Sequence, residues 1–82
     1  MDAADPKVER AVAAIRAYLR ERPEASDTAD GIAHWWVHPA TGETDPRIVM
    51  AALAWLELRG EVVSRQLGRR FLYQAGPGLR EG

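Results

Sequence analysis

Apolar residues recur at helical spacing in three stretches of the chain. The first stretch carries them three or four positions apart, on one face of a helix: Val8, Val12, Ile15 and Leu19. Asp5 followed by Pro6 predicts its start, because a carboxylate caps free backbone amides and proline is tolerated in the first turn. Pro23 disfavours helical geometry in the residue before it, so the helix is expected to end at Arg22. Charged residues beside this stripe are expected to be solvated: Glu9, Arg10, Arg16 and Arg20.

A second helix is predicted over residues 29–37. Residues 26–28 read Ser-Asp-Thr and supply side chains that cap free backbone amides at its start. Its apolar residues share one face: Ala29, Ile32, Ala33 and Trp36. Residues 38–44 contain Pro39 and Gly42 among small polar residues, so they are expected to form a turn.

A third helix is predicted from Pro46 to Arg59. Asp45 precedes the proline, as in the first helix, and Gly60 is the expected left-handed stop. The core-facing stripe of this helix is predicted to comprise four residues: Val49, Ala52, Leu53 and Leu56.

After Gly60 the pattern changes to that of strands. Strand-forming residues lie on either side of Leu67-Gly68-Arg69: Val62, Val63, Phe71, Leu72 and Tyr73. This predicts a hairpin whose turn uses Gly68 for a positive φ angle. The fold class is therefore α+β, three helices followed by a two-stranded antiparallel hairpin. We place one domain at residues 1–75 and a flexible C-terminal tail at residues 76–82, which are rich in glycine.

The order of helix, helix, helix and hairpin resembles the winged helix-turn-helix superfamily over nearly the whole chain. The second half is similar to bacterial regulators of the arsenic-repressor and multiple-antibiotic-resistance types, and the residues that carry the likeness are Val49, Ala52-Leu53, Leu56, Gly60, Val62, Gly68 and Phe71-Leu72-Tyr73. The resemblance implies a winged-helix fold with the hairpin as the wing. Those families are mostly DNA-binding repressors, whereas other winged helices are protein-interaction modules.

The third helix departs from a DNA-reading helix. Such a helix presents polar or basic side chains to the major groove. Here the residues opposite or beside the core stripe are apolar: Met50, Ala51, Ala54, Trp55 and Leu58. Arg47 and Arg59 lie only at the two ends. We interpret this side as a protein interface with Trp55 at its centre. The alternative is that Trp55 packs under the wing and Leu58 packs against the first helix.

Trp35 and Trp36 give a second indication of an interface. Neighbouring side chains on a helix point about 100° apart, so both cannot occupy the centre of one small core. Trp36 is the predicted core residue. Trp35 is expected at the edge, either as a lid over the core or as part of the contact surface.

The wing carries the strongest case for nucleic acid. Arg65, Arg69 and Arg70 cluster near the predicted hairpin tip and, with Arg47, are candidates for phosphate contacts. The chain as a whole has a formal net charge of -1, which does not favour a dedicated nucleic-acid binder. Solvated arginines are also ordinary on an exposed hairpin, where they protect its edges from pairing.

Other chemistry finds little support. The chain has no cysteine, so thiolate metal sites and thiol nucleophiles are excluded. His34 and His38 have the spacing of metal ligands on a helix, but Pro39 predicts that the helix is already ending there. No phosphate-binding glycine loop or nucleophile elbow is present. We expect no metal, no cofactor, no small-molecule substrate and no catalysis.

Two functions remain. The first is a non-catalytic interaction module that joins a protein partner or a second copy through the third helix. The second is a small DNA-binding transcriptional regulator that uses the third helix and the basic wing. No apolar run reaches the roughly 18 residues of a membrane span, so a cytoplasmic protein without a membrane partner is expected.

Overall fold

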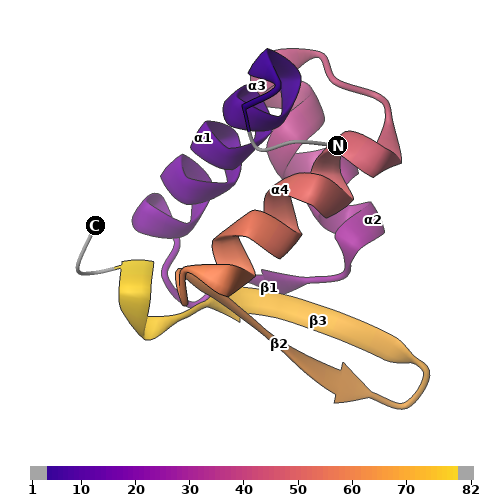
Figure 1. The fold of residues 1–82 in the computed structure, drawn as a ribbon. Helices are drawn as coiled ribbons and strands as arrows, with labels where there is room; N and C mark the ends of the chain where they lie inside the picture. Colours follow the sequence, from indigo (N-terminus) through magenta and orange to yellow (C-terminus); the bar gives the residue numbers. More distant parts are fainter. Residues whose placement is uncertain (1–3, 80–82) are drawn as a thin grey trace.

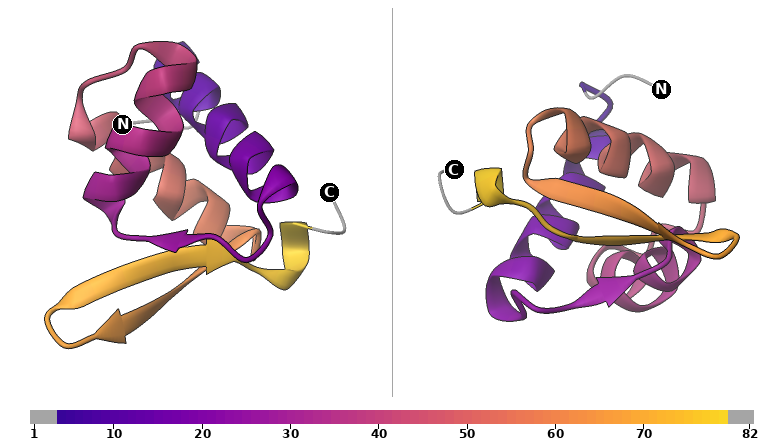
Figure 2. Two further views of the ribbon diagram at one scale, coloured as in Figure 1. Left: turned by 180° about the vertical axis from the view of Figure 1, so that it is seen from behind. Right: turned by 90° about the horizontal axis from the view of Figure 1, so that it is seen from below.

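Helices and a small antiparallel sheet form two layers. The structure, a computed structural model, describes residues 4–79. Its helical elements are α1 (Pro6–Glu21), α2 (Ala29–Gly31), η1 (Ile32–Val37), α3 (His38–Thr41), α4 (Pro46–Leu58) and η2 (Pro77–Leu79). Its strands are β1 (Ser26–Asp27), β2 (Val62–Leu67) and β3 (Arg70–Ala75). The larger helices lie on one side of the sheet, and the connection between β2 and β3 projects beyond them (Figures 1 and 2). The chain is α+β, as predicted.

The starts of α1 and α4 are capped as predicted. The Asp5 carboxylate accepts the backbone N–H of Lys7 at 2.8 Å, and the Asp45 carboxylate accepts that of Arg47 at 2.9 Å. Each helix has a proline in its first turn, where the missing N–H is not needed. Each ends one residue before the predicted boundary, and Gly60 follows α4 with a φ of 71°.

The predicted end of the second helix at Val37 is wrong. Helical backbone continues from α2 through the π-helical η1 and into α3, so the turn begins only at Gly42. The backbone N–H of His38 bonds to the carbonyl of Ala33, five residues earlier. Pro39 therefore follows a widened turn and lies in the first turn of α3, where its ring and its missing donor are tolerated.

The sheet has three strands rather than the expected two. β1 pairs antiparallel with β3, opposite Gln74 and Tyr73, which gives the strand order β1-β3-β2. Serine and aspartate have low strand propensity, so no local signal marks residues 26 and 27 as a strand. The capping role expected for this segment is present as well, because the Thr28 hydroxyl accepts the backbone N–H of Gly31 at 3.2 Å.

β2 and β3 are joined by the two residues Gly68 and Arg69, with Leu67 opposite Arg70. Gly68 has a φ of 63°, the positive angle predicted for this turn. Side chains on a strand alternate between faces, and Val62 is buried. The face that Val62 shares with Ser64, Tyr73 and Phe71 is therefore the one turned toward the helices.

The expectation of a free tail from Gly76 is wrong for residues 76–79. The backbone N–H of Gly76 donates to Glu61 O, and that of Gly78 donates to Gly60 O, both at 2.8 Å. Side chains at Gly76 or Gly78 would collide with the backbone beside Gly60, so glycine permits this close approach. Leu79 is buried in the core. Residues 80–82 of the predicted tail lie outside the described residues.

One core lies between the helices and the sheet. The predicted stripe of α1 is buried, and Trp36 is buried with its ring stacked on Tyr18 at a centroid distance of 4.3 Å. The core side chains are Val8, Ala11, Val12, Ala14, Ile15, Leu19, Ile32, Trp36, Val37, Ile48, Val49, Ala52, Leu53, Leu56, Val62 and Leu79.

Glu61 is a buried carboxylate at the junction of three elements. It accepts two hydrogen bonds from Arg16 of α1, each at 2.8 Å, and one from Arg59 Nε at the end of α4, also at 2.8 Å. The Arg16 guanidinium holds the pKa of this carboxyl below its ordinary value, against the opposing effect of burial. Arg16 is thus half-buried and paired, contrary to its predicted place on the solvated side of the first helix.

We expect Glu61→Gln to lower the free energy of unfolding by about 2 kcal/mol, since the amide group faces guanidinium donors that it cannot satisfy. Urea denaturation monitored by circular dichroism measures this loss. Glu57→Gln is the control, because the exposed Glu57 accepts from the Ser64 hydroxyl and from no other group of residues 4–79. Its expected effect is within about 0.5 kcal/mol. Equal losses in the two variants would contradict the special role of Glu61.

The lowered pKa of Glu61 also predicts a pH dependence. A carboxyl with a lower pKa in the folded state contributes stability fully above its unfolded-state pKa, about 4.3 for glutamate, and loses it as pH falls through the folded-state value. The stability gap between the wild-type chain and Glu61→Gln is therefore expected to narrow below about pH 4.5. Urea denaturation at a series of pH values checks this; a gap that widens toward acid would contradict it.

Candidate functional site

Most of the outward side of α4 is apolar, with the exposed Arg47 in its first turn and the exposed Glu57 in its last turn. The predicted core stripe is buried, together with Ile48, so the inner side of the helix is fully packed. On the outer side Leu58 is 87% exposed and Met50 is 47% exposed, with the exposed Ala54 between them in sequence and the half-buried Ala51 beside it. We call Met50, Ala51, Ala54 and Leu58 the α4 face. Because Leu58 is so exposed, the alternative that packs it against the first helix is wrong.

Trp55 borders the α4 face rather than forming its centre. The side chain is half-buried and packs against the core. The Arg16 guanidinium lies 5.7 Å from its ring centroid and that of Arg59 lies 4.8 Å away, both within the range of cation–π attraction. Trp55 lines a shallow recess with residues of α1, so the alternative that packs it under the hairpin is also wrong.

The polar side chains beside the α4 face already have partners. Arg47 donates to the Asp45 carboxylate at 3.2 and 3.0 Å, and this hydrogen bonding lowers the pKa of Asp45 and raises that of Arg47. Glu57 accepts from the Ser64 hydroxyl at 3.0 Å. The middle of the α4 face consists of aliphatic and thioether side chains, which have no hydrogen-bond donors for a base edge.

A hollow adjoins the α4 face on the side of the sheet. It is lined by residues from α2, α4 and β3 and by the cap of α2: Thr28, Ala29, Asp30, Met50, Arg70, Phe71 and Tyr73. Met50 belongs both to this hollow and to the α4 face, so the two are continuous. Phe71 is 51% exposed and was not among the predicted site residues. Its strand register, on the same face as Val62, is the signal that would have indicated it.

The arginines of the hairpin are exposed. Arg65, Arg69 and Arg70 form no ion pair with any residue between 4 and 79. Arg65 and Arg70 occupy strand positions on the face opposite to Val62, and Arg69 lies in the turn. Arg47 differs from them because Asp45 holds its guanidinium. The three hairpin arginines are therefore available to bind a ligand, whereas Arg47 is already paired with Asp45.

Trp35 and the two histidines belong to the second helical region. Trp35 is 65% exposed, and its ring meets that of His34 edge to face at 4.5 Å. Trp35 is thus an edge residue on a different helix from the α4 face. His34 and His38 are both exposed. Among residues 4–79, no group of three or more histidine, aspartate or glutamate side chains is arranged to hold a metal ion.

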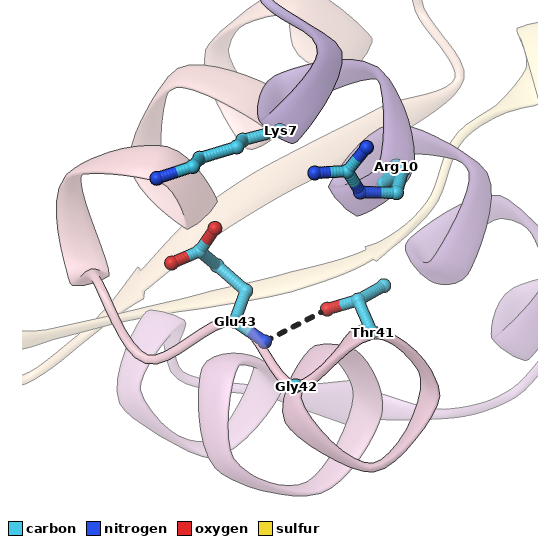
Figure 3. Close-up of a pocket in the computed structure, with 5 residues that line it drawn as sticks. All are labelled: Lys7, Arg10, Thr41, Gly42 and Glu43. Carbon is cyan, nitrogen blue, oxygen red and sulfur yellow. Dashed lines mark hydrogen bonds between the residues drawn. The ribbon is translucent and has the colours of Figure 1, made fainter.

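A pocket between α1 and the loop after α3 carries opposite charges (Figure 3). Lys7 and Arg10 extend from α1 above the Glu43 carboxylate, which comes from the loop. That carboxylate accepts the backbone N–H groups of Thr44 and Asp45 at 3.1 and 3.0 Å, and so stabilises the turn that leads into α4. The pocket therefore has a structural use, so we do not take it as the functional site.

Arg16 and Glu61 also border the site without having been predicted there. Glu61 lies between the helix stop Gly60 and the buried Val62, a place where a charged side chain indicates a buried ion pair. Nothing local indicates its partner Arg16, which is 45 residues away in the sequence.

The described part of the chain contains no helix that is both long and apolar enough to cross a membrane. The α4 face, with Trp55 at its border and the adjoining hollow, is the candidate site that the geometry supports best. In comparisons with known proteins, no family model, no curated protein and no solved structure matches the chain. The assignment of the site therefore rests on the geometry alone.

Proposed function

We propose that the chain is a non-catalytic winged-helix module that joins a protein partner, or a second copy of itself, through the α4 face. The winged-helix assignment is supported by the order of the elements, with the β2–β3 hairpin following α4 directly. A cytoplasmic location is part of the proposal and fits a chain without cysteine. No catalytic role is assigned, because the carboxylates whose pKa is lowered, Glu61 and Asp45, are held by arginines.

The exposure of Leu58 and Met50 carries the proposal. Both lie on a helix whose other side already fills the core, so no rearrangement within the domain is needed to present them. Covering one large aliphatic side chain contributes about 1.5–3 kcal/mol to association. Ala51 and Ala54 lie at intermediate positions along the helix and leave room for a partner to approach closely.

We expect Leu58→Glu to abolish association through this face and to leave the fold intact, because Leu58 is almost fully solvated. Losing the contribution of this side chain corresponds to a decrease in affinity of roughly 10- to 150-fold. Light scattering after size exclusion measures self-association, and quantitative affinity capture with the variant and wild-type chains as baits measures partner retention. Leu58 is a sharper test than Trp55, whose replacement would also disturb contacts with Arg16 and Arg59.

Leu67→Gln is the control, since Leu67 is also strongly exposed but lies on β2 near the hairpin turn, and an uncharged substituent does not neutralise the neighbouring hairpin arginines. It is expected to keep the mass and the captured partners of the wild-type chain. If Leu58→Glu also keeps both, the α4 face is not the interface.

DNA binding is the second candidate function, and the arginines of the projecting hairpin, which have no ion-pair partner among residues 4–79, favour it. Under our main proposal, a duplex is held weakly and only at low salt. Changing Arg65, Arg69 and Arg70 together to Gln is expected to remove this residual binding and to reduce the slope of log affinity against log salt by about 3. Fluorescence anisotropy with a random-sequence duplex measures both. Tight, arginine-dependent binding at about 0.15 M salt would replace the interaction module with a DNA-binding protein.

A further inference from the structure

The charges around the α4 face are unequal. Residues 45–75 contain five arginines and three acidic residues, although the whole chain has a formal net charge of -1. The three carboxylates already have partners. Asp45 binds Arg47, Glu57 accepts from Ser64, and Glu61 binds Arg16 and Arg59. The cations on this part of the molecule thus exceed the anions that could neutralise them.

Several guanidinium donors remain available at the borders of the face. On the α1 side, only Nε of the half-exposed Arg59 is bonded to Glu61, so its two terminal nitrogens have no acceptor among residues 4–79. On the sheet side, Arg70 lines the hollow beside Met50 and has none either. Arg65 and Arg69 also have none and lie close to Arg70 on the hairpin. Two further carboxylates lie nearby: Glu9 in the recess beside Trp55 and Asp30 in the hollow. They are single charges on other helices, and the arginine excess on the sheet side persists.

We propose that the α4 face and its adjoining hollow bind an acidic amphipathic helix from a different protein. The apolar stripe of that helix covers Met50 and Leu58, and one anchor side chain enters the hollow beside Phe71. Its flanking carboxylates meet the hairpin arginines and Arg59. This rests on the proposed function and names the chemistry of its partner. It follows the common mode in which an amphipathic helix lies in an apolar groove.

The arrangement disfavours the other occupants. A second copy related by a two-fold axis presents the same surface to itself, so the bordering arginines of both copies would share one interface in which they outnumber the nearby carboxylates Glu9 and Asp30. The phosphates of a nucleic acid would pair with the arginines, but its polar base edges and phosphates would make no favourable contact with the apolar α4 face. An acidic amphipathic helix satisfies both the apolar face and the arginines.

The test is selection from a display library of random peptides of about 18 residues, roughly five helical turns, on the full chain. We expect the enriched peptides to be acidic, with apolar residues at spacings of three and four. Synthetic copies are then titrated by fluorescence anisotropy at low and high salt. Leu58→Glu and the combined Arg65→Gln, Arg69→Gln and Arg70→Gln variant are each expected to weaken binding at least tenfold, and added salt is expected to weaken it further.

The control variant combines Lys7→Gln, Arg10→Gln and Arg22→Gln, which removes the same amount of positive charge from α1 and its C-terminal cap. It is expected to bind the peptides within about twofold of wild type, because none of the three side chains lines the hollow or the recess beside Trp55. Weakening equal to that of the hairpin variant would show only a net-charge effect and would overturn the proposal.

The remaining outcomes distinguish a failure of this inference from a failure of the proposed function on which it rests. Peptides that require Leu58 but show neither acidic bias nor dependence on the hairpin arginines would overturn the acidic partner and leave the interaction module standing. Peptides that do not require Leu58 would overturn both. A dimer that forms through Leu58 with no peptide enriched would identify a second copy as the occupant, and displacement of the peptides by duplex DNA at equal concentration would assign the arginines to nucleic acid.

Discussion

The buried Glu61 carboxylate is the interaction on which the arrangement of the other elements depends. A charge in this position must be paired, and pairing brings together Arg16 from the middle of α1 and Arg59 from the end of α4. The backbone of Glu61 makes two further links, because its N–H donates to Leu56 O and its carbonyl accepts from Gly76. Glu61 therefore connects α1, α4, the start of β2 and the segment before η2.

The same cluster influences which side of α4 faces solvent. Arg16 and Arg59 flank the Trp55 ring and hold it between α4 and α1. The side of α4 that carries Val49, Ala52, Leu53 and Leu56 fills the core. Glu57 is connected to β2 by the hydrogen bond that it accepts from Ser64. What remains is the sector of Met50, Ala54 and Leu58, whose side chains are all exposed. An apolar strip outside a completed core is a typical mark of an interaction surface.

The sequence identified which residues form the candidate site, but it did not show which of them are exposed to solvent. The 3.6-residue period places Met50, Ala51, Ala54 and Leu58 away from the core stripe whatever surrounds the helix. The period does not say whether α1 or the hairpin covers them, and both arrangements were open for Leu58 and Trp55. The packing of the neighbouring elements determined the surroundings of the two residues: Leu58 is exposed to solvent, whereas Trp55 lies against α1.

The sequence by itself determined the features that a few adjacent residues control. Asp-Pro pairs begin α1 and α4, Gly68 supplies the positive φ of the hairpin, and helical spacing selects Trp36 over Trp35 for the core. Only the tertiary structure decided the two-residue strand β1, the position of Leu79 and the pairing of Arg16 with Glu61. The physical reason is range. Capping and turn chemistry act within one helical turn, whereas strand pairing and burial of a charge depend on segments brought together only when the core closes.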